Sequence, residues 1–560
     1  MKLSIKQLIR VISFLILGMA FLFCLQGVMS KKWFYPAVVD APVDMLKEFY
    51  QLSENTEIQA AFLGTSHSEY VIDPMAIYEH NGIVTYNLSF ANQYADVSSF
   101  LLAELLERQH PSVITFDASR LFHNDFEEQY EPWYRAALDN TPLSLNKVKL
   151  AKEYASNYPV EKQVGSFLGV FFPIYRYHDR WSELSAIDFS PRQVQNCYRK
   201  GYYLTSRMVP YDLDPEWINE EAQSLIDNVG WTQKIVDRTQ ESFTEDSRLY
   251  EPVINETARS QLERMKQLCD ENGVRLMLLK IPAVGDPQYY SGAWTRSRSE
   301  ATKKLAEELG VDFLDLFYDV DLGIDWTKDT LDGGKHLNYG GASKISAFLA
   351  EYLEKECGLT GRKSQAYEED LPLYRAMCDV TELQMVNDLT AYLDMIARYD
   401  DVTVFLSVAD DMMSNMPKEG RAALRRLGLQ TDFDSLSYSD AFLAVIENGT
   451  VRCEMSSNRR ISYEDVLRNG QAYLISSCGY LVGTESKIVI NGCDYSLNHR
   501  GINIVVLDNA SGKVLDSAAF DTWDVPGHQS AIRNNPKTEK FLREYEEYLM
   551  VQDAKNGIGA

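Results

Sequence analysis

Residues 59–68 read Gln-Ala-Ala-Phe-Leu-Gly-Thr-Ser-His-Ser, and this stretch decides the fold of the first half of the chain. The apolar run Gln59–Leu63 predicts a buried β-strand, which ends at the turn formed by Gly64, Thr65 and Ser66. Ligands gather at the carboxyl ends of the strands of a parallel sheet, so Ser66 stands where a nucleophile would. The alternative is that this turn is only an ordinary cap of the next helix.

Further strands and helices alternate downstream of this turn. Strand, helix, strand repetition indicates parallel pairing with crossover helices, so we expect a three-layer α/β sheet. The segment from 120 to about 250 is instead aromatic and irregular, and we expect a helical cap inserted there over the sheet. The other predicted strands are 84–89, 113–117, 274–282 and 311–316, and the predicted helices are 98–109, 257–272 and 300–309.

An acid and a histidine follow the last predicted strand, in the stretch Asp332-Gly333-Gly334-Lys335-His336. A serine hydroxyl is a poor nucleophile at its own pKa and needs a histidine base, which an acid in turn orients. The two segments together therefore favour catalysis over a simple helix cap. His67 is expected to point elsewhere if the turn after the first strand opens a helix.

The pairing of these segments resembles the SGNH/GDSL hydrolase superfamily over residues 55–355. It is most similar to the membrane-anchored D-alanyl-transfer and polysaccharide O-acetyl-transfer proteins of Gram-positive bacteria. The resemblance implies that Ser66 is the nucleophile, His336 the general base and Asp332 the orienting acid. The Ser66 amide would form the oxyanion hole with Ser89 or Asn92. The matching residues are Gly64-Thr65-Ser66, Asn87-Leu88-Ser89, Asn92-Gln93, Tyr177-His178-Asp179-Arg180-Trp181 and His336-Leu337-Asn338.

The spacing between the acid and the histidine differs from the superfamily pattern. The acid usually stands three residues before the histidine, whereas Asp332 stands four residues before His336. The Gly333-Gly334 pair can absorb the extra residue; if it does not, Asp332 is only a turn residue. Ser89 also takes the place of a glycine. A second hypothesis therefore stays open, in which a non-catalytic glycan-binding or cell-envelope assembly protein uses the SGNH fold as a platform.

Four further side chains are candidates to line the cleft around Ser66. Asp117 and Arg120 follow the third predicted strand, Lys280 lies at the end of the fourth, and His178 belongs to the predicted cap. Charged residues also stand at strand ends simply because strands end at the surface, and His178 is equally well explained as a packed cap residue. The sequence leaves both interpretations open.

Residues 11–29 form an apolar run long enough to cross about 30 Å of hydrocarbon. Lys2, Lys6 and Arg10 precede the run, which predicts an N-terminus inside the cell and the bulk of the chain outside it. We therefore expect residues 1–30 to be a short stub and an uncleaved single-pass membrane anchor. A cleaved signal peptide is the alternative, although its apolar core would be unusually long.

A second domain is predicted after the SGNH-like domain at 31–357. Residues 358–375 are expected to be a linker, because their Gly, Ser, Pro and charged residues show no apolar period. An α+β domain over 376–550 and a tail over 551–560 should follow. The expected helices are 381–399 and 418–427, and the expected strands are 403–408, 442–446, 487–490, 502–507 and a hairpin partner after Ser511-Gly512.

This second domain is very similar to the ILEI/PANDER (interleukin-like EMT inducer) family. In the animal cytokines the Phe-Asp-Thr half comes first, but here it comes last, so the domain resembles a circular permutation. Related domains recognise sugars, which implies carbohydrate binding by this domain. The candidate residues are Arg500, Asp508, Asp521 and Trp523, all of which could equally be structural. The residues that carry the resemblance include 403–411, 424–429, 438–445, 479–483, 500–508, 511–516 and 520–523.

Charge and cysteine spacing exclude several classes of protein. The 81 acidic and 55 basic residues give a net charge of −26, which argues against a nucleic-acid partner and against tightly held anionic polymers. The widely spaced cysteines contain no C-x-x-C pair, so no metal site is indicated, and no cofactor is implied. The expected function is that of a serine esterase or O-acyltransferase outside the membrane. Its expected partner is a cell-surface polysaccharide or an acyl donor.

Overall fold

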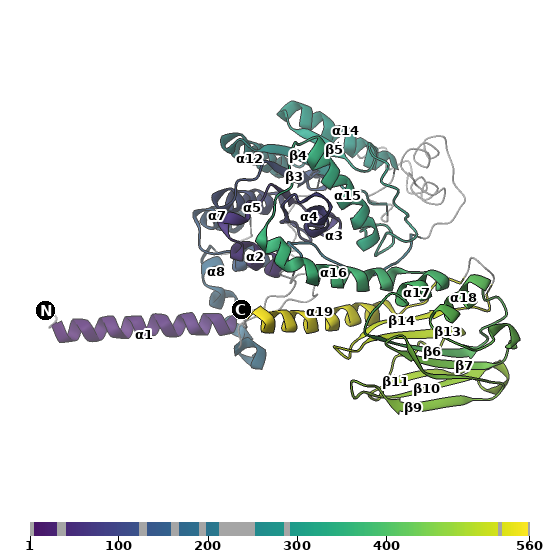
Figure 1. Ribbon diagram of the computed structural model, residues 1–560. Coiled ribbons are helices and arrows are strands. Elements are labelled where there is room, and N and C mark those ends of the chain that lie inside the picture. The colour runs from purple at the N-terminus through teal and green to yellow at the C-terminus, as the bar shows by residue number, and fades with distance from the viewer. Residues whose placement is uncertain are drawn as a thin grey trace. The chain divides into compact units, whose positions relative to one another are not determined.

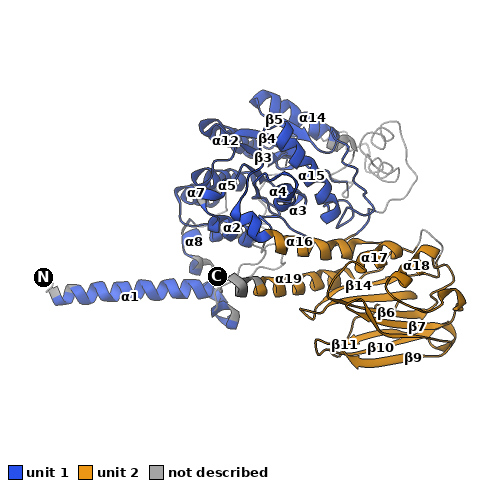
Figure 2. Ribbon diagram, viewed as in Figure 1, with its two compact units in different colours: residues 1–204, 209–370 blue, residues 205–208, 371–560 orange. Residues whose placement is uncertain are grey.

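The computed structural model (Figure 1) describes residues 5–30, 41–122, 131–157, 167–189, 198–211, 252–284, 292–524 and 529–557. The chain divides into two compact units (Figure 2). Unit 1 comprises residues 1–204 and 209–370, and unit 2 comprises residues 205–208 and 371–560.

Unit 1 is built on a five-stranded sheet in which all neighbouring strands are parallel. The strand order is β2-β1-β3-β4-β5. In a doubly wound sheet of this order the connections diverge between β1 and β3, and a crevice opens there at the carboxyl ends. The predicted parallel α/β sheet is therefore confirmed. Its strands are β1 (Ala60–Leu63), β2 (Thr85–Asn87), β3 (Val113–Asp117), β4 (Arg275–Lys280) and β5 (Asp312–Asp315).

Helices cover both faces of this sheet, because successive strand residues point to opposite sides (Figure 1). Ala61 and Leu63 belong to one buried layer, together with residues of α5, α12 and α14. Ala60 and Phe62 belong to the other, with residues of α3, α4 and α15. The bounds are α3 (Ser66–Val71), α4 (Pro74–Asn81), α5 (Ala95–Arg108), α12 (Glu256–Asn272), α14 (Gly292–Leu309) and α15 (Tyr339–Lys355).

The predicted cap is helical where the structure describes it. α2 (Ala41–Gln51) precedes the sheet in the chain, and the cap helix α6 (Glu131–Asn140) packs against α2. The rest of the described cap comprises α7 (Leu145–Asn157), α8 (Phe167–Phe171), α9 (Pro173–Tyr177) and the 3-10 turns η6 (His178–Ser182) and η7 (Ala186–Phe189). Cap residues 123–130, 158–166, 190–197 and 212–250 lie outside the described residues.

One helix has the length and composition of a membrane span. Within α1 (Ile5–Met29), residues Ile9–Met29 are apolar enough to cross a bilayer. The expected single N-terminal membrane helix thus has a structural counterpart. Its orientation stays a prediction.

Unit 2 holds a nine-stranded sheet with the path β12-β11-β10-β6-β13-β14 and with β7, β8 and β9 attached to it. The sequence predicted β6, β7, β11, β13 and β14 but missed β8, β9, β10 and β12. β8 and β9 consist mostly of exposed or partly exposed residues, so they lack the apolar pattern that indicates a buried strand. The strands are β6 (Val402–Asp410), β7 (Ala441–Glu447), β8 (Thr450–Ser457), β9 (Ile461–Val466), β10 (Ala472–Gly479), β11 (Ser486–Ile490), β12 (Cys493–Asp494), β13 (Gly501–Asp508) and β14 (Val514–Phe520).

The predicted linker and the helix after it need correction. α16 (Gln365–Met385) begins inside residues 358–375 and contains Pro372, and the boundary between the units falls within this helix. The buried face of α16 includes three residues at helical spacing, Tyr367, Leu371 and Tyr374. This face is hard to recognise in the sequence, because two of the three are tyrosines and acidic residues lie between them.

The predicted helix 381–399 is in fact two helices. α17 (Leu389–Ile396) starts anew after Asp388, which accepts a hydrogen bond from the Ala391 amide. α18 (Lys418–Arg426) and α19 (Asn535–Gly557) complete the unit.

A buried ion pair ties the helices of unit 2 to its sheet. Arg533 Nε lies 3.0 Å from Asp516 Oδ2 on β14, and its Nη2 donates to the carbonyl of Val386 at 2.9 Å. Tyr392 of α17 donates its hydroxyl to the same carboxylate at 3.0 Å. Both charged side chains are almost fully buried, so each depends on the other to offset desolvation.

We expect Arg533→Met to destabilise unit 2 by about 3–5 kcal/mol, because it leaves the buried Asp516 carboxylate without its charged partner. Denaturant unfolding followed by tryptophan emission measures the change. Arg426→Met is the matched control, since the Arg426–Asp394 pair is largely exposed and its loss should cost less than about 1 kcal/mol. Equal effects of the two variants would contradict this assignment.

Candidate active site

Ser66 is the first residue of α3, directly after the turn that ends β1. The Thr65 hydroxyl caps this helix and donates to Asp117 Oδ2 at 2.6 Å, which ties the turn to the end of β3. Gly64 is required in this turn, because a Cβ there would lie 2.5 Å from the Cβ of Asp117. The Gly-Thr-Ser turn therefore holds Ser66 at the crevice between β1 and β3.

The structure brings Ser66, His336 and Asp332 together in the order that nucleophilic catalysis requires. Ser66 Oγ lies 2.8 Å from His336 Nε2, and His336 Nδ1 lies 2.6 Å from Asp332 Oδ2. Burial, the largest single effect, raises the pKa of Asp332, but the ring and backbone hydrogen bonds from His336, together with electrostatic interactions with the nearby histidines, outweigh it and hold the pKa below its usual value. The carboxylate is therefore charged at neutral pH and can stabilise an imidazolium on His336.

Two glycines let Asp332 reach His336 across four residues. Gly333 and Gly334 have φ values of +80° and +94°, in the left-handed region that favours glycine. Asp332 Oδ1 also accepts the backbone N–H of His336 at 2.7 Å, so the carboxylate holds this histidine by both ring and backbone. The extra residue relative to the superfamily spacing is thus accommodated within the turn.

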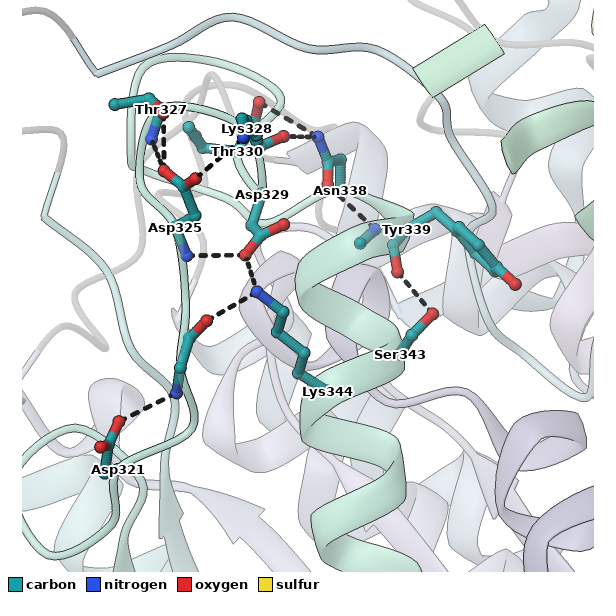
Figure 3. A network of polar contacts seen from close by, with 12 residues as sticks. Asp321, Asp325, Thr327, Lys328, Asp329, Thr330, Asn338, Tyr339, Ser343 and Lys344 are labelled. Carbon is teal, nitrogen blue, oxygen red and sulfur yellow. Dashed lines mark hydrogen bonds and ion pairs between the residues drawn. The ribbon is translucent and has the colours of Figure 1, made fainter. Parts of the chain in front are cut away.

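A polar network fixes the loop that carries His336 (Figure 3). The buried carboxylate of Asp329 accepts from Lys344 Nζ at 2.5 Å and from the Asp325 amide at 2.7 Å. Asn338 caps α15 through the Gly340 amide and donates to the carbonyl of Lys328 at 2.7 Å. These bonds anchor both ends of the loop to α15, so His336 is presented from a rigid support.

Two rings of α3 enclose the imidazole of His336. The ring centroids of His67 and Tyr70 lie 4.9 Å and 5.2 Å from that of His336. The expectation that His67 points elsewhere is therefore wrong, because α3 directs it toward the site. Burial, followed by the nearby His336, lowers the pKa of His67 to about 3, so this histidine is neutral. The Thr65 hydroxyl donates to Asp117, so the 3.2 Å contact with His67 Nδ1 requires a proton on that nitrogen.

The loop after β2 packs against the nucleophile turn. Gly64 donates its N–H to Gln93 Oε1 at 3.0 Å and accepts from the Phe90 amide at 3.2 Å. Ser89 is buried, its amide donates to Asn87 Oδ1, and its hydroxyl has no hydrogen-bond partner in the described part of the chain. Asn92 has a φ of +53° in the same loop. Both predicted oxyanion residues thus belong to the loop bonded to Gly64, and they stay candidates.

A cavity opens beside His67 and Asp117. Of the predicted cleft residues, Asp117 and Lys280 line it. Lys280 donates to Ser299 Oγ at 2.5 Å, and burial, opposed by Asp315, lowers its pKa to about 8. The full lining is His67, Asp117, Ala118, Ser119, Phe122, Lys280, Ile281, Ala283, Arg298, Thr302 and Phe317.

Arg120 and His178 do not line this cavity. Arg120 Nε donates to the carbonyl of Gln93 at 2.6 Å, and its guanidinium lies 5.0 Å from the ring centroid of Tyr94, so it packs behind the loop. His178 lies in η6 of the cap, with Nδ1 3.0 Å from the carbonyl of Tyr175. The side chains that the sequence missed are His67, Tyr70 and Arg298. His67 and Tyr70 lie one helical turn apart on α3, directly after Ser66, and this spacing is the sequence signal that could have placed them at the site.

Three of the four sugar-binding candidates meet at one end of the unit 2 sheet. Arg500 binds Asp521 through Nε at 2.9 Å and Nη2 at 2.6 Å, and its guanidinium lies 4.2 Å from the ring centroid of Trp523. Asp508 is at the opposite end of β13, where Oδ2 accepts the Ser511 amide of the hairpin turn. It pairs with Val402, whereas Gly501 pairs with Ala409. Asp508 is therefore a turn residue, separate from this cluster.

The described residues contain no group of three or more His, Cys, Asp or Glu side chains that could hold a metal ion. A comparison with protein families matches the interleukin-like EMT inducer (ILEI) family over residues 500–548. The ILEI prediction is thereby confirmed for β13, β14 and the start of α19, and the match does not extend to unit 1. No curated protein matches the chain.

We expect Asp332→Asn to reduce turnover of an activated ester by about 10³–10⁴-fold, because an amide cannot stabilise the charged imidazole or select its tautomer. The initial rate with p-nitrophenyl acetate measures this loss. Asp321→Asn is the matched control in the same loop, where the exposed Asp321 only accepts the Gly323 amide. Turnover unchanged in Asp332→Asn would show that Asp332 is merely a turn residue.

A buried carboxyl behind Ser66 predicts a pH dependence of stability. Burial raises the pKa of Glu69 on α3 from 4.5 to about 8, against an opposing hydrogen bond from the Ala91 backbone. The folded state therefore holds a proton that the unfolded chain releases, so stability present below pH 4.5 is lost as the pH rises to about 8.

In the Glu69→Gln variant this pH dependence should be weaker by up to about 1.4 kcal/mol per pH unit, because glutamine does not titrate. Thermal unfolding of parent and variant at pH 5 and pH 8 measures it. Glu271→Gln, at an exposed position of α12, should leave the pH dependence unchanged. An identical pH profile in parent and Glu69→Gln would contradict the prediction.

Proposed function

We propose that unit 1 is a membrane-anchored serine esterase or O-acyltransferase of SGNH type that acts on an ester of a cell-surface glycan. The observation that carries this proposal is the continuous contact from Ser66 Oγ to His336 and from His336 to Asp332. The strand order supports it, because Ser66 follows β1 and Asp117 ends β3, the two strands at which the connections diverge.

The proposed reaction proceeds through an acyl enzyme. Ser66 Oγ attacks the ester carbonyl carbon while His336 Nε2 takes the hydroxyl proton, and Asp332 stabilises the resulting imidazolium. The tetrahedral intermediate then collapses, and His336 returns the proton to the leaving alcohol oxygen. In the second half, His336 takes a proton from water or from a sugar hydroxyl while the oxygen of that group attacks the acyl carbon, and His336 then returns the proton to Ser66 Oγ as the acyl–serine bond breaks. No cofactor enters this sequence.

The cavity beside His67 offers room for the group attached to the reacting carbonyl. Its walls carry Ala118, Ile281, Ala283 and Phe317, which favour an apolar acyl group of modest size. Ser119 and Thr302 add hydroxyls on the same lining. These residues support a short acyl chain such as acetyl, whereas the ammonium group of an alanyl ester would need a charged partner, for which Asp117 is the carboxyl on the same lining.

Unit 2 supports a glycan as the carrier of this ester. Its ILEI match and the cluster of Arg500, Asp521 and Trp523 are the supporting observations. Trp523 is about half exposed, and an aromatic face beside charged hydrogen-bonding groups suits a pyranose ring. With α1 as an anchor, we place both units outside the membrane, which stays part of the proposal.

The proposal predicts that a fluorophosphonate probe labels the purified full-length protein on Ser66, because the probe reacts with an activated serine hydroxyl. Ser66→Ala should lose the label and reduce ester turnover by at least about 10³-fold. Intact-mass and peptide mass spectrometry identify the adduct. Ser119→Ala, which alters a hydroxyl on the cavity wall, should keep the label.

A second candidate function is glycan binding without catalysis, favoured by the exposed Trp523 surface. Retention of the protein on immobilised polysaccharide, with no probe adduct and unchanged ester turnover in Ser66→Ala, would support this candidate over the enzyme. A Ser66 adduct together with lost turnover in Ser66→Ala would exclude it as the sole function.

A further inference from the structure

The end of α1 is built into the cap of unit 1. Side chains along most of α1 are exposed, as at Phe23, whereas Met29 is only 4% exposed. Arg180 Nη1 of η6 donates to the carbonyl of Met29 at 2.7 Å, and Gln26 Nε2 donates to the carbonyl of Phe171 at 3.4 Å. The last turn of the membrane-length helix is therefore attached to folded structure.

The cap segment at this attachment carries a set of large exposed apolar side chains. Phe172, Tyr175, Trp181 and Phe189 are 52%, 48%, 73% and 68% exposed. All four lie within the 18 residues from 172 to 189. We call these four side chains the aromatic cap surface. So dense a group of exposed rings is uncommon on a surface that faces only water.

Ion pairing holds this segment in place. Arg180 Nη2 binds Asp188 Oδ1 of η7 at 2.8 Å, and Asp188 Oδ2 accepts the Ser185 amide at 2.9 Å. Arg180 thus links η6, η7 and the end of α1 through one guanidinium. The positions of Trp181 and Phe189 relative to Met29 are fixed by these contacts.

We propose that the aromatic cap surface lies in the headgroup region of the membrane that α1 crosses. The 21 residues Ile9–Met29 span about 31 Å at 1.5 Å per residue, which matches the hydrocarbon thickness and places Met29 at its boundary. Tyrosine and tryptophan favour this boundary, because their rings are apolar and their polar atoms remain hydrated. The occupant of the surface is therefore lipid, and this inference rests on the proposed membrane crossing of α1.

This arrangement gives unit 1 a second attachment to the bilayer. A single helix leaves a domain able to swing on its tether, whereas additional side chains in the interface restrict its tilt. Because the triad and the aromatic cap surface belong to the same compact unit, the contact would hold the mouth of the site at a defined height above the lipid.

Quenching of tryptophan emission by brominated lipid tests the inference on the full-length protein. The protein is reconstituted in phosphatidylcholine vesicles with acyl chains either unlabelled or brominated at carbons 6 and 7. Subtracting the emission of Trp181→Phe from that of the parent isolates Trp181. We expect the bromine to reduce this emission by about half or more, because interfacial tryptophans lie close to the upper acyl chain.

Trp326→Phe is the matched control within unit 1, because Trp326 is 1% exposed in the core and its emission should be unchanged by bromine. Unquenched Trp181 in protein that floats with the vesicles after an alkaline wash would overturn the inference while leaving the anchor intact. Protein that no longer floats would overturn the anchor and the inference together. Neither outcome depends on catalysis. Labelling of Ser66 by the fluorophosphonate probe tests the proposed function separately, and equal labelling of parent and Trp181→Phe shows that the variant is correctly folded.

Discussion

The close approach of the β1 turn to the end of β3 is the constraint on which the site depends. Gly64 has no side chain and so allows Asp117 to lie against it, and the Thr65 hydroxyl is bonded to that carboxylate. The same glycine is bonded on both backbone atoms by the loop after β2. The end of β3 and the loop after β2 therefore both contact the turn at Gly64 that follows β1, and Ser66 begins α3 two residues later. Displacement of the turn would separate Ser66 from His336, whose own loop is held independently by α15.

Much of unit 1 could be predicted from local patterns, because buried parallel strands are continuous apolar runs and their turns carry glycine and hydroxyl residues. The contact between Ser66 and His336 followed from chemistry, since a serine nucleophile implies a base and an acid. The side chains that enclose this contact could not be predicted in the same way. His67 and Arg120 are both polar residues after strands, yet one faces His336 and the other packs behind the loop. The direction of α3 decides the first outcome, and that of the 3-10 turn η3 (Ala118–Phe122) decides the second.

In unit 2 the limits of sequence reasoning have a different cause. The missed strands β8 and β9 are largely exposed, so their side chains show no clear apolar face. α16 was obscured because buried tyrosines share its sequence with acids. The pairing of β13 with its neighbours also decides which of the candidate sugar-binding residues lie together. Arg500 directly precedes β13 and Asp508 ends it, which puts them at opposite ends of this strand, whereas Asp521 returns beside Arg500 through the hairpin. The resemblance and the side-chain types therefore suggested four candidates where the fold assembles three.

The paired glycines before His336 have a consequence for the detection of similar sites in other sequences. A search pattern that demands an acid three residues before the histidine would pass over this chain. The left-handed φ values of Gly333 and Gly334 show how the longer pattern, Asp-Gly-Gly-x-His, still brings the carboxylate to the imidazole. Replacement of either glycine by a residue with a Cβ would make that loop costly. Both glycines, and not the acid alone, should therefore serve as its diagnostic signature.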